Sequence, residues 1–197
     1  MKTKRIGITG GIGSGKTTAC KLFELLGIPV YYADDRAKWL MNNDPDLKQQ
    51  LMDTFGTQTY DEAGQLNRPF LAQLVFNDRS QLDKLNSIVH PAVRADGIRW
   101  DEAHRDTPYT LREAALLYES GIYKLLDKII CVTAPESVRI ARVIARDNTT
   151  AEAVKARIDK QWPEQDKIQL ADYIIQNDGE QSLIRQVYDV HVVLRRK

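Results

Sequence analysis

The sequence predicts an α/β fold with a parallel sheet and a helical insertion. Strand and helix patterns alternate at the start of the chain, four helical patterns follow without a strand, and strand patterns then return. A helix that connects two strands by a crossover places them in parallel. We therefore expect a core domain at residues 1–34 and 106–197, with an inserted helical lobe at residues 35–105.

The first part of the chain predicts a strand–loop–helix–strand unit. Residues 5–9 form a short apolar strand, and residues 15–26 form a helix with an apolar face that Gly27 ends. Residues 28–33 predict a second strand. Pro29 lies at its start, where the missing N–H of a proline is tolerated.

The inserted lobe is predicted to be helical. Pro91 interrupts its last helical pattern, so we expect a break or kink near His90. The predicted helices of the lobe span residues 35–42, 45–54, 68–76 and 79–104.

The last third of the chain returns to mixed structure. Residues 128–133 predict a strand, whereas the pattern that begins at Tyr109 fits either a strand at 109–113 or a helix. The remaining expected elements are helices at 136–146, 150–161 and 180–195 and a short strand at 172–176.

Composition excludes several classes of protein. The chain has 197 residues, of which 43% are hydrophobic and 28% charged, and this balance argues against disorder. Lys and Arg number 28 against 27 Asp and Glu, so no basic excess suggests nucleic acid as a partner. No targeting segment or membrane span is visible. Cys20 and Cys131 do not form a disulfide framework, so we expect a cytoplasmic protein with reduced thiols.

One motif carries the chemistry, the pattern G-x-x-x-x-G-K-[ST]. It consists of Gly10, Gly11, Ile12, Gly13, Ser14, Gly15, Lys16 and Thr17. Average residue frequencies give a chance match of roughly 1% in a chain of this length, and the motif also follows a strand and opens a helix. The alternative is a glycine-rich turn without a ligand.

The residue types in this motif suit a nucleoside triphosphate. Glycines let successive backbone N–H groups point at phosphate oxygens, and the following helix adds its positive N-terminal end. Lys16 is expected to bridge the β- and γ-phosphates, and the Thr17 hydroxyl to bind Mg²⁺. The motif leaves open what happens to the γ-phosphate.

Asp34 is the first candidate for that chemistry. It ends the second predicted strand, on the side where open α/β sheets bind ligands, so it is expected to face the γ-phosphate. A carboxylate there can accept a proton from an attacking hydroxyl or hold Mg²⁺ through water. The alternative is that Asp34 or Asp35 only caps the following helix.

Arg139, Arg142 and Arg146 share one face of a predicted helix. Such a stripe is often a solvated surface, but near a phosphate loop an arginine can neutralise a transferring phosphoryl group. We assign Arg142 and Arg146 to the site and Arg139 to the surface.

The histidines give weaker signals. His90 precedes Pro91 and is either a substrate contact or a structural residue, whereas His104 and His191 are expected to be solvated. The histidines and cysteines share no metal-ligand spacing, so a zinc site is not expected.

Taken in order, these residues resemble the dephospho-coenzyme A kinase family across almost the whole chain. The motif at 10–17 resembles the family's extended phosphate loop, and His90-Pro91 and Leu116-Leu117-Tyr118-Glu119 resemble two of its specific motifs. Further resemblances are Ala33-Asp34, Leu66-Asn67-Arg68, Val75-Phe76, Arg142, Arg146-Asp147, Gln161, Ala171-Asp172 and Asn177. Tyr32 departs from the family's Asp-Ala-Asp pattern, and Ala115 replaces a proline.

The resemblance implies a P-loop kinase three-layer fold with a helical substrate-binding insertion and a helical lid at about 136–165. It also implies a reaction in which ATP–Mg²⁺ phosphorylates the ribose 3′-hydroxyl of dephospho-coenzyme A, the last step of coenzyme A biosynthesis. The implied catalytic residues are Asp34, Lys16 and Arg142; Arg146 and Asn177 belong to the ATP side, and Arg68, His90 and Glu119 to the acceptor side.

Two alternatives come from other classes. One is another P-loop nucleoside or nucleotide kinase, which the residues alone do not separate from the first interpretation. The other is a regulatory P-loop NTPase, which commonly needs an Asp at the end of a downstream strand as a second Mg²⁺ ligand. The predicted strand at 128–133 ends in Thr133-Ala134 instead, which favours a kinase. The oligomeric state is not predicted.

Overall fold

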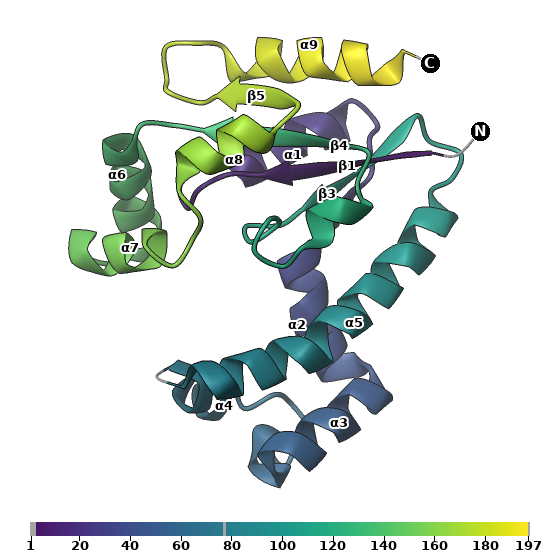
Figure 1. Ribbon diagram of the computed structural model, residues 1–197, viewed down its shortest axis with the longest axis vertical. Helices are drawn as coiled ribbons and strands as arrows, with labels where there is room; N and C mark the ends of the chain where they lie inside the picture. Colours follow the sequence, from purple (N-terminus) through teal and green to yellow (C-terminus); the bar gives the residue numbers. More distant parts are fainter. Residues whose placement is uncertain (1–2, 77, 197) are drawn as a thin grey trace. The chain divides into compact units, whose positions relative to one another are not determined.

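The computed structural model describes residues 3–76 and 78–196 and contains a parallel sheet (Figure 1). Its strands follow the order β2-β3-β1-β4-β5, and every neighbouring pair is parallel. The strands are β1 (Lys4–Thr9), β2 (Val30–Tyr32), β3 (Tyr109–Glu113), β4 (Lys128–Thr133) and β5 (Tyr173–Gln176).

The chain divides into two compact units. The first comprises the chain up to Tyr32 together with the chain from Asp101 onward, and the second comprises Ala33–Trp100. The sheet belongs entirely to the first unit, whereas the second is built from helices.

Helices α1 (Lys16–Leu25) and α9 (Leu183–Arg195) cover one face of the sheet in the first unit. Ile6 and Ile8 point to this face, where they join Phe23 of α1 and Val187 of α9 in one buried apolar cluster. Because side chains alternate along a strand, Gly7 between them faces the other side.

The opposite face of the sheet is covered by the segment after β3 and by α8 (Glu164–Leu170). A Cβ at Gly7 would lie 2.6 Å from Leu126 and 3.1 Å from Leu117, so this face packs directly on the β1 backbone. The 3₁₀ helix η2 (Ile122–Leu125) lies within the covering segment. The first unit therefore has the expected three layers.

Two further helices follow β4. They are α6 (Glu136–Asp147) and α7 (Ala151–Ile158), joined by Asn148 in the left-handed conformation with φ 49°. Thr150 caps α7 by accepting the Ala153 N–H at 3.3 Å, as its position at the predicted helix start suggests.

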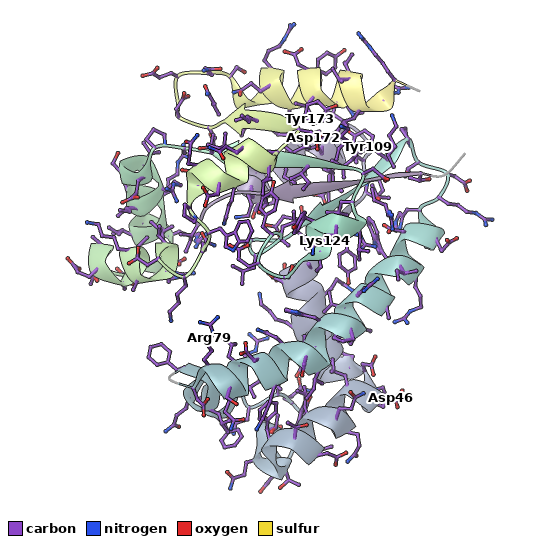
Figure 2. The ribbon with its side chains drawn as sticks, viewed as in Figure 1. Asp46, Arg79, Tyr109, Lys124, Asp172 and Tyr173 are labelled. Atoms are coloured by element: carbon purple, nitrogen blue, oxygen red, sulfur yellow. The ribbon has the colours of Figure 1, made fainter. Side chains whose placement is uncertain are left out.

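Side-chain bonds also fasten β5, an edge strand, to β4. The Asp172 carboxylate accepts from Lys128 Nζ at 2.6 Å and from the Ile129 N–H at 2.8 Å. Figure 2 shows Asp172 and Tyr173 together where the chain enters β5, and Tyr109 where it enters β3. These bonds fix the register in which β5 continues toward Asn177.

The second unit contains α2 (Ala33–Asn43), α3 (Pro45–Phe55), the 3₁₀ helix η1 (Thr57–Thr59), α4 (Arg68–Phe76) and most of α5 (Arg79–Ala103). Arg36 donates to both carboxylate oxygens of Asp96, at 2.9 and 2.7 Å, and so connects α2 to α5. The buried apolar residues of the second unit are Leu40, Leu47, Leu51, Phe55, Tyr60, Leu71, Val89 and Val93.

The last helix of the lobe does not break at Pro91, because α5 continues through it, and the alternative of a kink near His90 stays a prediction. Pro91 removes one helical N–H and frees the Ser87 carbonyl, but both residues lie on the exposed side. Val89 and Val93 are buried on either side of Pro91 and hold the helix in place.

Most other predicted elements are confirmed, and the ambiguous pattern at Tyr109 is a strand, β3. The sequence did not predict α8, and the helix predicted from 180 begins at Leu183. The expected solvation of His191 is wrong, because its ring is buried and bonds through Nδ1 to the Tyr109 hydroxyl at 2.8 Å.

Among the described residues, no helix is both long and apolar enough to cross a membrane.

Candidate active site

The phosphate-loop motif occupies the turn between β1 and α1, as the sequence predicts. Gly13 and Gly15 take φ values of 78° and 91°, which residues with a Cβ rarely adopt. The Ser14 N–H bonds to the Gly11 carbonyl at 3.1 Å and closes the turn.

Neighbouring atoms also leave no room for a side chain at two glycines of this loop. A Cβ at Gly10 would lie 2.0 Å from the Val132 carbonyl oxygen, and one at Gly15 would lie 2.1 Å from Asn177 Nδ2. The glycines therefore let the loop sit between β4 and the end of β5, with a backbone free to approach phosphate oxygens.

Lys16 is the first residue of α1, and its side chain is buried. Its Nζ donates to the Gly10 carbonyl at 3.0 Å, so the ammonium group reaches back across the loop. Thr17 follows it in the first turn of α1 and is exposed, which leaves its hydroxyl accessible to a ligand.

Asn177 lies at the loop, although it is far from it in the sequence. Its side-chain amide donates to the Ser14 carbonyl at 2.8 Å, and its backbone N–H bonds to Thr133 at 2.7 Å. The parallel pairing of β4 with β5 carries it there, because the carboxyl ends of parallel strands meet at one edge.

Arg142 lies in the middle of α6, near the same edge. Its Nη1 is buried and has no hydrogen-bond partner among the residues that the structure describes. Bonds from the Gln181 and Glu180 amides lower the pKa of Asp178, and the charge of Arg142 lowers it further, which places Arg142 close to the residue after Asn177. A partly buried arginine with one unpartnered, buried donor atom suits an anionic ligand.

The other two candidates of the first unit make different contacts. Arg146 is 61% exposed and donates to both oxygens of Asp147, at 2.6 and 3.0 Å. Glu119 accepts the Trp162 N–H at 2.8 Å and pairs with Lys167 at 3.3 Å. Neither contact involves the phosphate loop.

Asp34, Arg68 and His90 belong to the second unit. Asp34 is the second residue of α2 and follows β2 almost directly, Arg68 begins α4, and His90 lies in α5. All three are exposed, and their assignment to the site remains a prediction from the sequence.

The assignment of Arg139 to the surface is wrong, because its side chain is only 4% exposed. It turns toward the loop and pairs with Glu164 of α8 at 3.1 Å. The helical periodicity predicted its place on the same face as Arg142, but the burying residues come from distant segments.

Sequence reasoning also missed Glu113, which is 8% exposed at the end of β3. It lies in register with Ile8 of β1, two residues before Gly10 of the phosphate loop. Burial raises the pKa of the Cys20 thiol, the nearby Glu113 raises it further, and Lys16 lowers it, so both charges lie near Cys20. Knowledge of the strand order could have revealed this carboxylate as a site residue. Both β3 and β4 border β1, so the end of β3 also lies beside the phosphate loop.

Glu113 also removes the argument drawn from Thr133-Ala134. A strand beside β1 does end in a carboxylate, so the lack of one after β4 does not separate a kinase from a regulatory NTPase.

A parallel sheet in this order, with a glycine-rich loop that leads from its central strand into a helix, defines a protein with the fold of the P-loop kinases. A shikimate kinase from Bacteroides thetaiotaomicron shares the fold, with a TM-score of 0.52 and 15% identity over 98% of this chain and 99% of that one.

The comparisons name the family. The family model for dephospho-CoA kinase matches residues 4–182, so the chain belongs to the dephospho-CoA kinase family. It is 35% identical to the dephospho-CoA kinase of Bacteroides fragilis over 98% of this chain and 94% of the relative. It is 40% identical to that of Salinibacter ruber over 88% of each chain.

Two solved structures resemble the whole chain. A dephospho-CoA kinase from Campylobacter jejuni has a TM-score of 0.72 and 25% identity over 97% of this chain and 96% of that one. A protein of Thermus thermophilus has a TM-score of 0.85 and 32% identity over 98% of both.

Proposed function

We propose that this protein transfers the γ-phosphate of ATP to the ribose 3′-hydroxyl of dephospho-coenzyme A and so forms coenzyme A. The observation that carries the proposal is an intact phosphate loop, with Lys16 buried across it, in a chain that matches the dephospho-CoA kinase family along almost its whole length.

ATP binding is assigned to the loop and its neighbours. Backbone N–H groups of the loop and the N-terminal end of α1 supply positive potential without side chains, although the N–H groups of Ile12 and Ser14 already bond to Gln161 and Gly11. Lys16 contributes a point charge to the β- and γ-phosphates, and Asn177 holds the loop in shape through Ser14. Arg146 is assigned to the ATP side on the family resemblance.

The transfer is a single displacement at the γ-phosphorus. A bond forms between the 3′-oxygen and phosphorus, the bond to the β-phosphate oxygen breaks, and ADP leaves. Asp34 accepts the hydroxyl proton, while Lys16 and Arg142 neutralise the charge on the moving phosphoryl group.

The acceptor side is assigned to the second unit and the segment after β3. The helical lobe at 35–105 supplies Arg68 and His90, and Glu119 contributes from the first unit. Helices α6 and α7 form the core of a lid at about 136–165, whose closure would keep water from the γ-phosphate.

The residues at the loop fit Mg²⁺. This ion prefers oxygen ligands and keeps several waters and phosphate oxygens, so it needs few protein groups. Thr17 offers an exposed hydroxyl, and Glu113 offers a carboxylate at the end of the adjacent strand. These two would hold Mg²⁺, directly or through water, and the ion would neutralise phosphate charge.

Glu113→Gln is expected to raise the Mg²⁺ concentration for half-maximal activity about 10-fold, because an amide cannot replace a carboxylate's charge. Activity measured across a Mg²⁺ titration checks this. Glu24→Gln, which alters an exposed carboxylate on α1, is the matched control and should keep the wild-type curve. An unchanged titration of Glu113→Gln would remove this residue from the metal site.

An acceptor screen tests the proposed function. ADP release from ATP–Mg²⁺ is expected to rise strongly on addition of dephospho-coenzyme A and to stay at its basal level with nucleosides or nucleoside monophosphates. Stimulation by a nucleoside monophosphate instead would favour another nucleotide kinase. ADP release that no small acceptor changes would favour a regulatory NTPase.

A further inference from the structure

Arg139 is a buried cation whose described polar contacts are with other groups of the protein. Its Nε donates to the Ala134 carbonyl at 3.0 Å, and its Nη2 pairs with Glu164 Oε2 at 3.1 Å. These contacts fix the planar guanidinium at two edges, so that it has one orientation at the start of α6.

That orientation presses Arg139 against the phosphate loop. A Cβ at Gly11 would lie 2.4 Å from Arg139 Nη1 and 3.2 Å from Cζ, so the guanidinium lies against the Gly11 backbone. A Cβ at Gly13 would lie 2.4 Å from the Arg139 carbonyl oxygen. Both glycines therefore pack on one residue, and any displacement of Arg139 must displace the loop.

Glu164, the partner of Arg139, begins α8 and follows a segment that also contacts the loop. Gln161 Oε1 accepts the Ile12 N–H at 3.0 Å. The segment at 161–164 therefore reaches the loop at two points, through Gln161 directly and through Arg139. Figure 1 shows α6 and α8 near the end of β1 that leads into the loop.

Stability alone is a weak reason for this ion pair. Taking two charges out of water costs about as much as their attraction returns, and an apolar pair of similar volume often serves a fold equally well. A guanidinium held by two different partners has another advantage, since its fixed orientation holds neighbouring backbone atoms in one geometry.

We propose that Arg139 and Glu164 are positioning residues, whose ion pair holds the phosphate loop in the geometry that binds ATP. Arg139 acts through the Gly11 and Gly13 backbone and does not touch the phosphates in this role. The inference deepens the proposed function and rests on it for the identity of the second substrate.

The first test is Arg139→Gln, which removes the charge and the planar fork. We expect the KM for ATP to rise about 10-fold or more, because small misplacements of a binding group have large effects. The KM for dephospho-coenzyme A should stay within twofold of the wild-type value. A residue that only stabilises the fold would reduce the amount of active protein and leave both KM values unchanged.

Glu164→Gln and the double variant test the pair. We expect Glu164→Gln to raise the KM for ATP about threefold, and the double variant to match Arg139→Gln, because residues that act as a unit are not additive. Arg185→Gln is the control: it breaks an exposed pair with Asp189 on α9 and should change neither KM. Additive effects of the two single variants would overturn the pairing.

Two outcomes of the first test would overturn the proposal: a KM for ATP within twofold of wild type, or an equal rise in both KM values. Circular dichroism checks that each variant is folded. If Arg139→Gln does not fold, Arg139→Lys keeps the charge without the fork and should raise the KM for ATP by a smaller factor. Wild-type KM values in folded Arg139→Lys and Glu164→Gln would then overturn the proposal.

Direct titration with ATP–Mg²⁺ separates this inference from the proposed function. Weaker ATP binding by Arg139→Gln, with the acceptor absent, supports the positioning role even if dephospho-coenzyme A is not the substrate. Equal ATP affinity of variant and wild type overturns the role even if that substrate is correct.

Discussion

Asp34→Asn is expected to lower kcat by about 10² or more while the KM for ATP stays near its wild-type value. Asparagine has almost the same shape as aspartate but cannot accept the proton of an attacking hydroxyl. Asp34 is exposed at the start of α2, so the substitution should leave the fold intact. Steady-state rates of ADP release with dephospho-coenzyme A, over a range of ATP concentrations, measure both quantities.

The adjacent carboxylate provides a matched control. Asp35 lies in the same helical turn, is exposed, and pairs with Lys38 at 2.8 Å. Asp35→Asn makes the same chemical change and should leave kcat within about twofold, since surface pairs contribute little. Near-normal turnover by Asp34→Asn, or an equal loss in both variants, would end the role of Asp34 as the base.

Local pattern was sufficient for most of the fold. β4 is a continuous apolar run and α1 begins at a phosphate-loop motif, so each could be recognised without its neighbours. β3 could not, because Arg112 looks unsuited to a central strand. The structure pairs Arg112 with Asp101 at 2.5 Å and places its guanidinium over Tyr31, so distant residues make the charge acceptable there.

The same limit explains α8. It has only seven residues, and a lysine in its sequence suggests an exposed segment, whereas Lys167 is buried in the structure. Glu119 pairs with that lysine at 3.3 Å, and the Tyr118 hydroxyl donates to its carbonyl at 3.2 Å. Both partners come from the segment after β3, which a reading of local periodicity does not bring near α8.

The candidate site divides in a similar way. The phosphate loop was predictable because its functional residues are consecutive and each has a backbone reason to be there. Arg139 was not, because its burial depends on Glu164 and on two glycines of the loop. Glu113 was missed because its value as a ligand depends on strand order, and the pattern of a single strand does not contain that order.

Lys16→Ala is expected to impair both ATP binding and transfer. Loss of a charged donor to phosphate should raise the KM for ATP about 10-fold or more. Loss of charge neutralisation in the transition state should lower kcat by about 10² to 10³. Rates measured at saturating dephospho-coenzyme A over a range of ATP concentrations give both values, and direct ATP titration checks the first independently.

A second substitution separates the effect of the lost charge from the effect of lost packing, because Lys16 is buried and donates to the Gly10 carbonyl at 3.0 Å. Lys16→Met keeps most of the aliphatic stem and loses only the ammonium group, so it should reproduce both losses if the charge is responsible. Lys21→Ala removes an exposed lysine from the same helix and should change neither value. Unchanged ATP affinity and turnover in a folded Lys16→Met variant would remove Lys16 from the site, whereas losses confined to Lys16→Ala would assign it a packing role.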